Sequence, residues 1–329
     1  MRKLASIQRI SKLEHIEGAD SIEKATVLGW QLVVKKDEFK EGDLCVYCEI
    51  DSILPERPEF EFLKSRKMRI RTIKLRGQIS QGICFTLSIL PEDVVIEEGK
   101  DVTEILDITK YEPPIPANLE GIAKGRFPSF IPKTDEPRVQ VVQDILDKYK
   151  NETFFYTEKL DGSSATYYFN DGRFGVCSRN LELLETEENT LWKLARLYKI
   201  EKKLKSLNRN IAIQGEIIGE FVQGNKYKLT GQDIFFFNAY DIDKHKFLNL
   251  DEFITFLKEL ELKTVPVLET NYKLSNNIEE LVELATGKSV LNDIQREGIV
   301  LRPVKEIVDN TGRISFKAIN PKFLLKYDE

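Results

Sequence analysis

The sequence contains few of the residues on which several common kinds of site depend. Only two of its 329 residues are histidines, so neither a histidine-based catalytic triad nor a His-rich metal site is expected. Four cysteines are too few for a disulfide framework. No apolar run approaches the roughly 20 residues that span a bilayer, and the N-terminus lacks a signal-peptide run. We therefore expect a cytoplasmic, soluble protein with reduced cysteines and no membrane partner.

An excess of positive charge is also missing. The chain has 49 Lys and Arg against 54 Asp and Glu, a net charge of −5, so a nucleic acid would have to bind at a local patch. What is present is the profile of a globular protein, with 41% hydrophobic and 31% charged residues. The length favours two domains, each with its own core.

The pair Cys45 and Cys48 forms a C-x-x-C, which could indicate a metal or redox site. The pair lies in the strand-like run LCVYCEI, where residues three apart point to opposite faces, and no second pair exists. We therefore interpret both cysteines as core residues.

The first hundred residues consist of short strand-like runs separated by glycine turns, which favours a small barrel. Within them, residues 64–76 contain seven cations and no acidic residue. If residues 67–71 form a strand, Lys67, Arg69 and Arg71 share one face, where they could bind a phosphate backbone. We predict an RNA or phosphate patch at Lys67, Arg69, Arg71, Lys74 and Arg76. The alternative is an edge strand whose charges prevent aggregation.

Clustered prolines at positions 113, 114 and 116 indicate a linker over residues 111–125. The sequence then alternates between helical and strand patterns, including one amphipathic helix over 190–207 and two final strands, EGIVLRP and ISFKAI. Asn170-Asp171-Gly172 predicts a tight hairpin turn. The predicted organisation is an α+β chain with a barrel domain at 1–110, the linker, and a second domain at 126–329.

Residues with catalytic potential occur in the second domain. Lys159, in Lys-Leu-Asp-Gly at a strand end, could act as a nucleophile once its amine loses a proton. The hairpin should bring Arg179 back towards it, and Lys317 lies in the final strand. Mg²⁺ prefers a few carboxylates, retained waters and phosphate oxygens. Three carboxylates could supply such a site beside a triphosphate, and they are Asp161, Glu216 and Glu297.

These segments occur in the order KLDG, CSRN, GE, FNAYDI, EGIVLRP and FKAINPKF. In that order they resemble motifs I, Ia, III, IIIa, IV and V of the covalent nucleotidyltransferase superfamily, which includes DNA and RNA ligases and mRNA capping enzymes. The resemblance covers roughly residues 126–329. It implies that Lys159 attacks the α-phosphate of a nucleotide and forms a lysyl–NMP.

The resemblance also implies roles for the other residues. Arg179 and Lys317 would contact the nucleotide and its α-phosphate, and Tyr240 would stack on the base. Glu216 would bind ribose or metal-bound water, and Glu297 would help to position the metal. Glu158 would face the adenine edge.

Only 12 residues follow Lys317, too few for the C-terminal OB barrel of DNA ligases and capping enzymes. An N-terminal OB-like domain, with FPSFIPKTDEPR before KLDG, resembles the ATP-dependent RNA ligases of the Naegleria and Deinococcus type, the fifth RNA-ligase family. Arg138 is then expected at the β- and γ-phosphates. Related phage ligases have a second motif V lysine where this chain has Ile319, and Lys322 or Lys326 is the candidate substitute.

The resulting hypothesis is an RNA-repair ligase that uses ATP and Mg²⁺ or Mn²⁺ to join RNA 3′-OH and 5′-phosphate ends, in a nicked duplex and as a monomer. Two alternatives stay open. One is a capping-type guanylyltransferase, which would be labelled by GTP. The other is a non-catalytic nucleic-acid-binding protein of the same shape.

Overall fold

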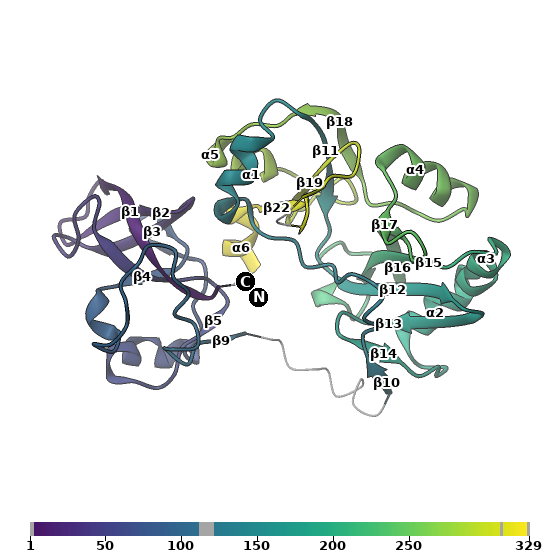
Figure 1. Ribbon diagram of the computed structural model, residues 1–329, viewed down its shortest axis with the longest axis horizontal. Coiled ribbons are helices and arrows are strands. Elements are labelled where there is room, and N and C mark those ends of the chain that lie inside the picture. The colour runs from purple at the N-terminus through teal and green to yellow at the C-terminus, as the bar shows by residue number, and fades with distance from the viewer. Residues whose placement is uncertain (1–2, 112–121, 310–311, 328–329) are drawn as a thin grey trace. The chain divides into compact units, whose positions relative to one another are not determined.

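A computed structural model describes residues 3–111, 122–309 and 312–327. The contacts within the chain divide it into two compact units (Figure 1). The first comprises Met1–Pro114, Val139–Gln143 and Pro321–Glu329, and the second comprises Ile115–Arg138 and Asp144–Asn320. Among the described residues, no helix combines the length and the apolar character that crossing a bilayer requires.

The first unit is built mainly from short strands. Its elements are β1 (Ala5–His15), β2 (Ile22–Val27), β3 (Trp30–Lys35), β4 (Leu44–Cys48), β5 (Ser52–Ile53), the 3₁₀ helix η1 (Pro58–Arg66), β6 (Ile73–Leu75), β7 (Gln78–Ser80), β8 (Ile83–Phe85), the 3₁₀ helices η2 (Leu87–Ile89) and η4 (Val139–Val141), β9 (Thr109–Lys110) and the helix α6 (Pro321–Tyr327). The helix α6 follows the two final strands and was not predicted.

The predicted small barrel is confirmed. Five antiparallel strands follow the order β3-β2-β1-β4-β8, and β3 and β8, at opposite ends of that order, contact each other. The gap between the two ends is bridged further by the Gln81 N–H, which donates to the Gln31 carbonyl at 2.8 Å. Trp30, Tyr47 and Phe60 fill the interior. A nearly closed sheet of this kind buries one face of each strand and leaves little exposed edge.

Cys45 and Cys48 are fully buried free thiols in β4, which confirms their prediction as core residues. Burial raises the pKa of the Cys48 thiol well above its usual range, so this group remains protonated and unreactive.

The prediction that residues 67–71 form a strand is wrong. Residues 58–66 form the helix η1, and Lys67 and Met68 then adopt left-handed φ angles of 52° and 60° that turn the chain. Met68 and Ile70 point into the core, and only Ile73–Leu75 forms a strand. Lys67, Arg69 and Arg71 therefore do not form a row on one strand face.

The second unit contains two antiparallel sheets and several helices. Its elements are β10 (Ala123–Arg126), α1 (Gln143–Lys148), β11 (Thr153–Lys159), β12 (Ser163–Asn170), β13 (Arg173–Cys177), β14 (Leu181–Leu183), α2 (Thr190–Leu197), α3 (Ile200–Ser206), β15 (Ile211–Gly219), the 3₁₀ helix η5 (Gln223–Asn225), β16 (Gln232–Asp241), β17 (Lys246–Phe247), α4 (Leu250–Glu259), β18 (Val267–Lys273), α5 (Ile278–Ala285), β19 (Gly298–Pro303), β20 (Val308–Asp309), β21 (Gly312–Arg313) and β22 (Phe316–Ile319).

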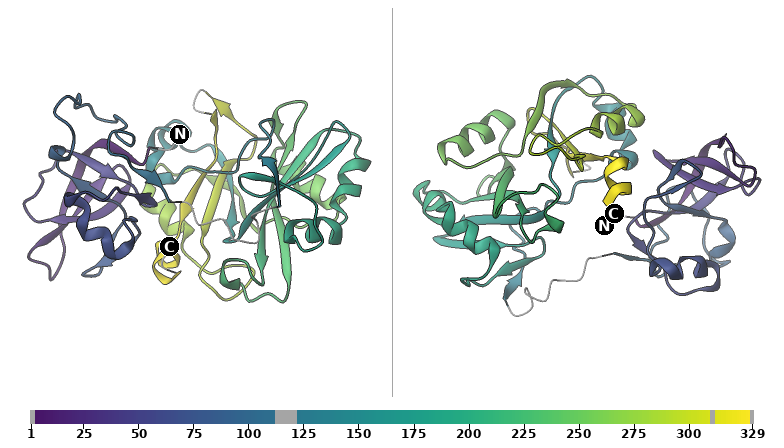
Figure 2. Two further views of the ribbon diagram at one scale, coloured as in Figure 1. Left: turned by 90° about the horizontal axis from the view of Figure 1, so that it is seen from below. Right: turned by 180° about the vertical axis from the view of Figure 1, so that it is seen from behind.

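The larger sheet has the order β10-β14-β13-β12-β15-β16-β17 and the smaller one β18-β11-β19-β22. Apolar residues of α2, α3 and α4 pack with Ile213, Ile217 and Phe236 on one face of the larger sheet, and Figure 2 shows α2 and α3 against it in teal. The fold class predicted for this part, antiparallel sheets with flanking helices, is confirmed.

Three local predictions can be compared with the structure. The tight turn is confirmed, because Asn170 pairs with Arg173 and the two residues between them have φ angles of 49° and 79°. The prediction of a single helix over 190–207 is wrong, because Lys199, with a φ of 53°, separates α2 from α3. Most of the predicted linker, residues 112–121, lies outside the described residues, and its end belongs to β10.

Candidate active site

Lys159 lies where the chain passes from one sheet to the other. It is the last residue of β11 in the smaller sheet, and β12 of the larger sheet begins four residues later. A Cβ atom on Gly162 would lie 2.1 Å from the Ile217 carbonyl oxygen of β15, so a side chain cannot fit at this crossing. The glycine of the KLDG motif is thus required by the close approach of two backbones.

Glu297 directly faces Lys159. The adjacent Gly298 pairs with Lys159 across β11 and β19, which places the glutamate at the same end of the sheet. The Lys159 Nζ donates to both Glu297 carboxylate oxygens, at 2.6 and 2.7 Å. The Lys159 side chain is 25% exposed and that of Glu297 is 11% exposed, so the pair is only partly open to solvent.

Two further carboxylates act on the same amine. Burial alone would lower the pKa of Lys159, but the negative charges of Glu297, Glu216 and Asp161 outweigh it and raise the pKa. Glu216 comes from β15 of the larger sheet, where Ser164 is its partner on β12. Burial raises the pKa of Glu216 to about 8, with Glu297 and Asp161 adding to the rise and Lys159 opposing it. The structure thus brings together the predicted nucleophile and all three predicted carboxylates.

Asp161 has a partner that the sequence analysis missed. Lys226, just after η5, forms an ion pair with the Asp161 carboxylate, and both side chains are about nine-tenths buried. The Asp161 N–H also donates to the Tyr227 hydroxyl at 2.8 Å. Burial and Glu297 raise the pKa of Asp161, while Lys226 and Lys159 lower it. The segment GNKYKL matches no motif, so only the folded chain reveals these contacts.

The cations predicted to bind the nucleotide lie near Asp135, a second residue that the sequence analysis missed. Arg179 lies 3.3 Å from Asp135, and Lys317 lies 3.7 Å from it. Arg138 and Lys317 form an isolated β-bridge. Burial and the neighbouring charges of Lys159 and Arg138 lower the pKa of Lys317 to about 8. A cluster of cations at the edge of a group of carboxylates is suited to a polyphosphate.

Glu158, next to Lys159, is 1% exposed. Its Oε2 accepts the Val290 N–H at 2.9 Å, and its Oε1 has no hydrogen-bond partner among the described residues. Burial raises the pKa of Glu158, an effect only partly offset by hydrogen bonds from Ser289 and Val290. A buried carboxylate oxygen without a partner is costly unless a ligand donor reaches it.

Tyr240 lies apart from this group. Its ring packs edge-on against Phe247, 4.9 Å between centroids, in a cluster with Ile131 and Tyr168. Two other aromatic residues of β16, Phe235 and Phe237, pack against the cluster that contains Leu160, the neighbour of Lys159. Phe237 sits at the β-bulge between β15 and β16, where it interrupts the regular pairing. These two rings, rather than Tyr240, are the β16 aromatics that pack closest to Leu160 and thus to the predicted nucleophile.

No group of three or more Asp, Glu, His or Cys side chains among the described residues is arranged to hold a metal ion directly. Asp161, Glu216 and Glu297 nevertheless surround one amine from both sheets. Hard divalent cations such as Mg²⁺ retain several waters and need few direct protein ligands. This donor set therefore fits a cation that is held mainly through water.

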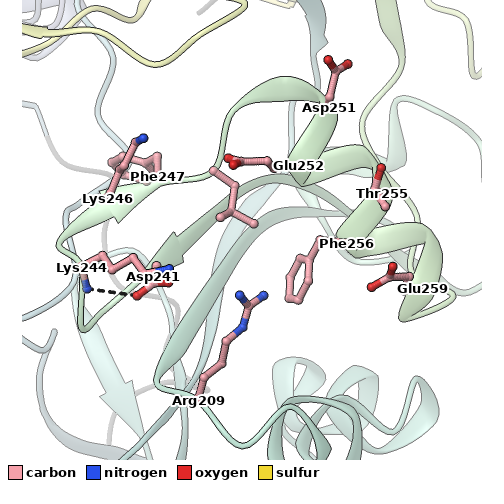
Figure 3. A pocket seen from close by; sticks show the side chains of 11 residues that line it. Arg209, Asp241, Lys244, Lys246, Phe247, Asp251, Glu252, Thr255, Phe256 and Glu259 are labelled. Carbon is pink, nitrogen blue, oxygen red and sulfur yellow. Dashed lines mark hydrogen bonds and ion pairs between the residues drawn. The ribbon is translucent and has the colours of Figure 1, made fainter.

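A separate cavity of about 590 Å³ lies between the end of β16 and α4 (Figure 3). Several of its polar groups have structural partners. Lys244 pairs with Asp241, Glu252 accepts the Asn249 N–H at the start of α4, and Arg209 lies over the Phe256 ring. The cavity contains none of the predicted site residues, and its mixed charge indicates no particular ligand.

The predicted patch of the first unit is less uniform than expected. Arg69 is paired with Asp51 at 2.8 Å and lies 3.6 Å from the centre of the Tyr111 ring. Lys67, Lys74 and Arg76 are exposed, and Arg71 is half-buried. Two of the seven cations in residues 64–76 are paired with acidic residues from outside that segment, Lys64 with Glu61 and Arg69 with Asp51.

Comparison with known proteins agrees with this architecture. The model of the RNA ligase family matches residues 152–319, and a model described as an OB-fold domain matches residues 4–87. A structure of Naegleria gruberi RNA ligase with pyrophosphate is 43% identical, with a TM-score of 0.92, and the match covers 100% of this chain and 99% of that one.

Two mutants of that ligase are similarly related, each 43% identical with 98% of both chains covered and a TM-score of 0.91. One is a lysine-to-alanine mutant with ATP and manganese, and the other is a lysine-to-methionine mutant with AMP and manganese. No curated protein matches the chain. The family match over half of the chain and the full-length identity of 43% show that this chain belongs to the RNA ligase family.

Proposed function

We propose that the chain is an ATP-dependent RNA ligase that works through a covalent Lys159–AMP. The observation that carries this proposal is the environment of the Lys159 amine, which is hydrogen-bonded to Glu297 and surrounded by Glu216 and Asp161 at the junction of two sheets. The similar Naegleria structures, which contain ATP, AMP, pyrophosphate or manganese, support ATP and a divalent metal as the substrate and cofactor.

The proposed reaction has three steps. The Lys159 Nζ, as a free amine, forms a bond to the α-phosphorus of ATP while the bond to pyrophosphate breaks. An RNA 5′-phosphate oxygen then attacks the same phosphorus, the P–N bond breaks, and the RNA end carries AMP. Finally an RNA 3′-hydroxyl attacks the 5′-phosphorus of that end, forms the phosphodiester and releases AMP.

The residues around Lys159 account for the first step. The carboxylates hold the amine in place but raise its pKa, so they favour the protonated form. A divalent cation held through water by Asp161, Glu216 and Glu297 would offset this charge and stabilise the phosphate oxygens. Lys317, Arg179 and Arg138 would bind the phosphates, with Asp135 positioning the first two. The unpartnered oxygen of Glu158 would accept a hydrogen bond from the adenine amino group. Phe237 is a better candidate than Tyr240 for stacking on the base.

The rest of the proposal concerns the RNA. The exposed cations Lys67, Lys74 and Arg76, together with Arg69 and Arg71, would bind its phosphates. The substrate would be a nicked duplex and the enzyme a monomer acting in RNA repair. A cytoplasmic location is consistent with the free thiols of all four cysteines.

Incubation with α-labelled ATP and Mg²⁺ or Mn²⁺ tests the central step. The parent protein should retain a covalent label, whereas Lys159→Ala, Lys159→Arg and the parent in excess chelator should retain none. Labelling of Lys159→Ala to the parental level would overturn the proposal. Labelling by GTP instead of ATP would indicate a capping-type enzyme. Nicked duplexes with RNA or DNA placed separately on each side of the break would then define the substrate.

A further inference from the structure

The loop between β15 and β16 exposes an aromatic side chain beside the active site. Phe221 is 97% exposed, more than any other large hydrophobic residue described as exposed. Large aromatic side chains in solvent gain nothing for folding, since burial of their apolar surface is the favourable term. A ring held in the open near a reaction centre therefore needs another explanation.

The loop holds this ring in a costly conformation. Phe221 has a φ of 65°, which is rare for a bulky residue with a Cβ atom. Several of its neighbours also have positive φ angles, and they are Gly219, Gln223, Gly224, Asn225, Lys228 and Gly231. A Cβ atom on Gly219 would lie 2.2 Å from the Gly231 carbonyl oxygen, so the base of the loop is tightly closed. Backbone strain of this kind persists only where surrounding contacts enforce it.

Those contacts connect the loop to the KLDG segment. Lys226 pairs with Asp161, Tyr227 accepts the Asp161 N–H, and the Gln223 amide donates to the Gly162 carbonyl at 3.4 Å. Within the loop, the Asn225 side chain is hydrogen-bonded to both the N–H and the carbonyl of Leu229. Phe221 is thus two residues from a contact with Gly162, which is itself three residues from Lys159.

The surroundings of Phe221 indicate what could cover it. The neighbouring Glu220, Gln223, Gly224 and Lys228 are exposed and polar or small, so the ring is not part of an extended apolar surface. A protein partner would need a larger contact area than one ring provides. One exposed aromatic ring matches one nucleobase, since bases stack on aromatic side chains irrespective of their sequence.

We propose that Phe221 is a stacking platform for a nucleobase of the RNA end brought to Lys159. This inference rests on the proposed function, because it requires RNA at that site. Stacking is an apolar contact, and the loop carries one exposed acid, Glu220, and one exposed cation, Lys228. The contribution of Phe221 should therefore depend little on salt, unlike that of a phosphate-binding lysine.

The test compares Phe221→Ala and Phe221→Trp with the parent and with Leu197→Ala, which shortens an exposed side chain on α2. Binding of a nicked RNA duplex should weaken about 5- to 150-fold in Phe221→Ala, return close to the parental value in Phe221→Trp, and stay unchanged in Leu197→Ala. Labelling by ATP should be the same in all four proteins. Equal RNA affinity of Phe221→Ala and the parent, or failure of Phe221→Trp to restore it, would overturn the inference.

Two further measurements locate the base. Single abasic sites placed along the RNA should include one position at which the parent loses affinity and Phe221→Ala does not. Because Trp30 and Trp192 are buried, bound RNA cannot stack on them, so RNA should quench the fluorescence of Phe221→Trp more strongly than that of the parent. An abasic scan without such a position contradicts the stacking role. Absence of ATP labelling in the parent would instead contradict the proposed function, independently of the binding results.

Discussion

The two units hold their positive charges in different ways. In the second unit Lys159, Lys226 and Lys317 are mostly shielded from solvent, and each faces a carboxylate from a distant part of the chain. In the first unit Lys74 and Arg76 are exposed on a short hairpin. Shielded charges depend strongly on their partners, whereas exposed charges are screened by water and salt. The effects of substitutions should therefore be large and coupled in the second unit but small and independent in the first.

The largest effect on stability should come from the buried pair Lys226–Asp161. Lys226→Met leaves the Asp161 charge without its partner, which should cost about 3–5 kcal/mol of unfolding free energy. The double variant Asp161→Asn with Lys226→Met removes both charges and should recover much of that loss. The unfolding transition of the second unit in denaturant gives the unfolding free energy of both variants. If the two variants were equally unstable, the loss would reflect packing of the lysine stem and not an uncompensated charge.

Glu297→Gln should give the next largest effect, here on chemistry. The amide keeps the shape of the side chain but removes the charge that holds the Lys159 amine, so the rate of Lys159–AMP formation should fall about 100- to 1,000-fold. Single-turnover labelling with ATP measures this rate, and an unchanged melting temperature would show that the fold is intact. A decrease of only two- or threefold would mean that Glu297 has no direct role in the first step.

Neutralising the exposed cations of the first unit should have smaller effects. Lys74→Gln and Arg76→Gln should each weaken RNA binding and reduce the slope of log affinity against log salt by about 0.7–0.9, and the two effects should add. Neither should alter labelling by ATP. A salt titration of RNA affinity measures the slope, and an unchanged slope in the double variant would exclude these residues from the RNA-binding surface.

Lys64→Gln should have the smallest effect and provides the matched control. Lys64 carries the same charge in the same segment but already pairs with Glu61 on the surface. Its loss should change the unfolding free energy by less than about 1 kcal/mol and the RNA affinity by less than either patch variant. If Lys64→Gln weakened RNA binding as much as Arg76→Gln does, pairing with Glu61 would make no difference to the contribution of Lys64.

Expectations based on local patterns agreed with the structure. The strand containing Lys159, the Asn-Asp-Gly turn and the strand that returns from it form where the periodicity and turn residues predict them. Two breaks in the chain were not predicted, one in the region expected to be a strand and one in the region expected to be a single helix. Lys67 and Lys199 adopt left-handed conformations without being glycine, and they end η1 and separate α2 from α3. Packing of the neighbouring core residues enforces these left-handed conformations. The local sequence therefore does not distinguish these two lysines from lysines with ordinary backbone angles.

For the site, the order of short motifs was enough to select Lys159, Asp161, Glu216 and Glu297, because each of them lies in or beside a strand with a recognisable pattern. Lys226 and Asp135 could not be selected in this way, since both come from irregular segments and matter only through the partners they meet in space. The structure adds a pair of candidates to Tyr240 for stacking on the base, because Phe235 and Phe237 pack against the cluster that contains Leu160.

The sequence by itself therefore determined the reaction class and selected the residues proposed to carry it, because bond formation at a lysine would require particular chemical groups at short, recognisable spacings. Only the tertiary structure decided how the charges are compensated, which aromatic ring lies near the site, and that Phe221 remains exposed. These properties depend on contacts between residues far apart in the chain, and such contacts arise from packing and not from local preference.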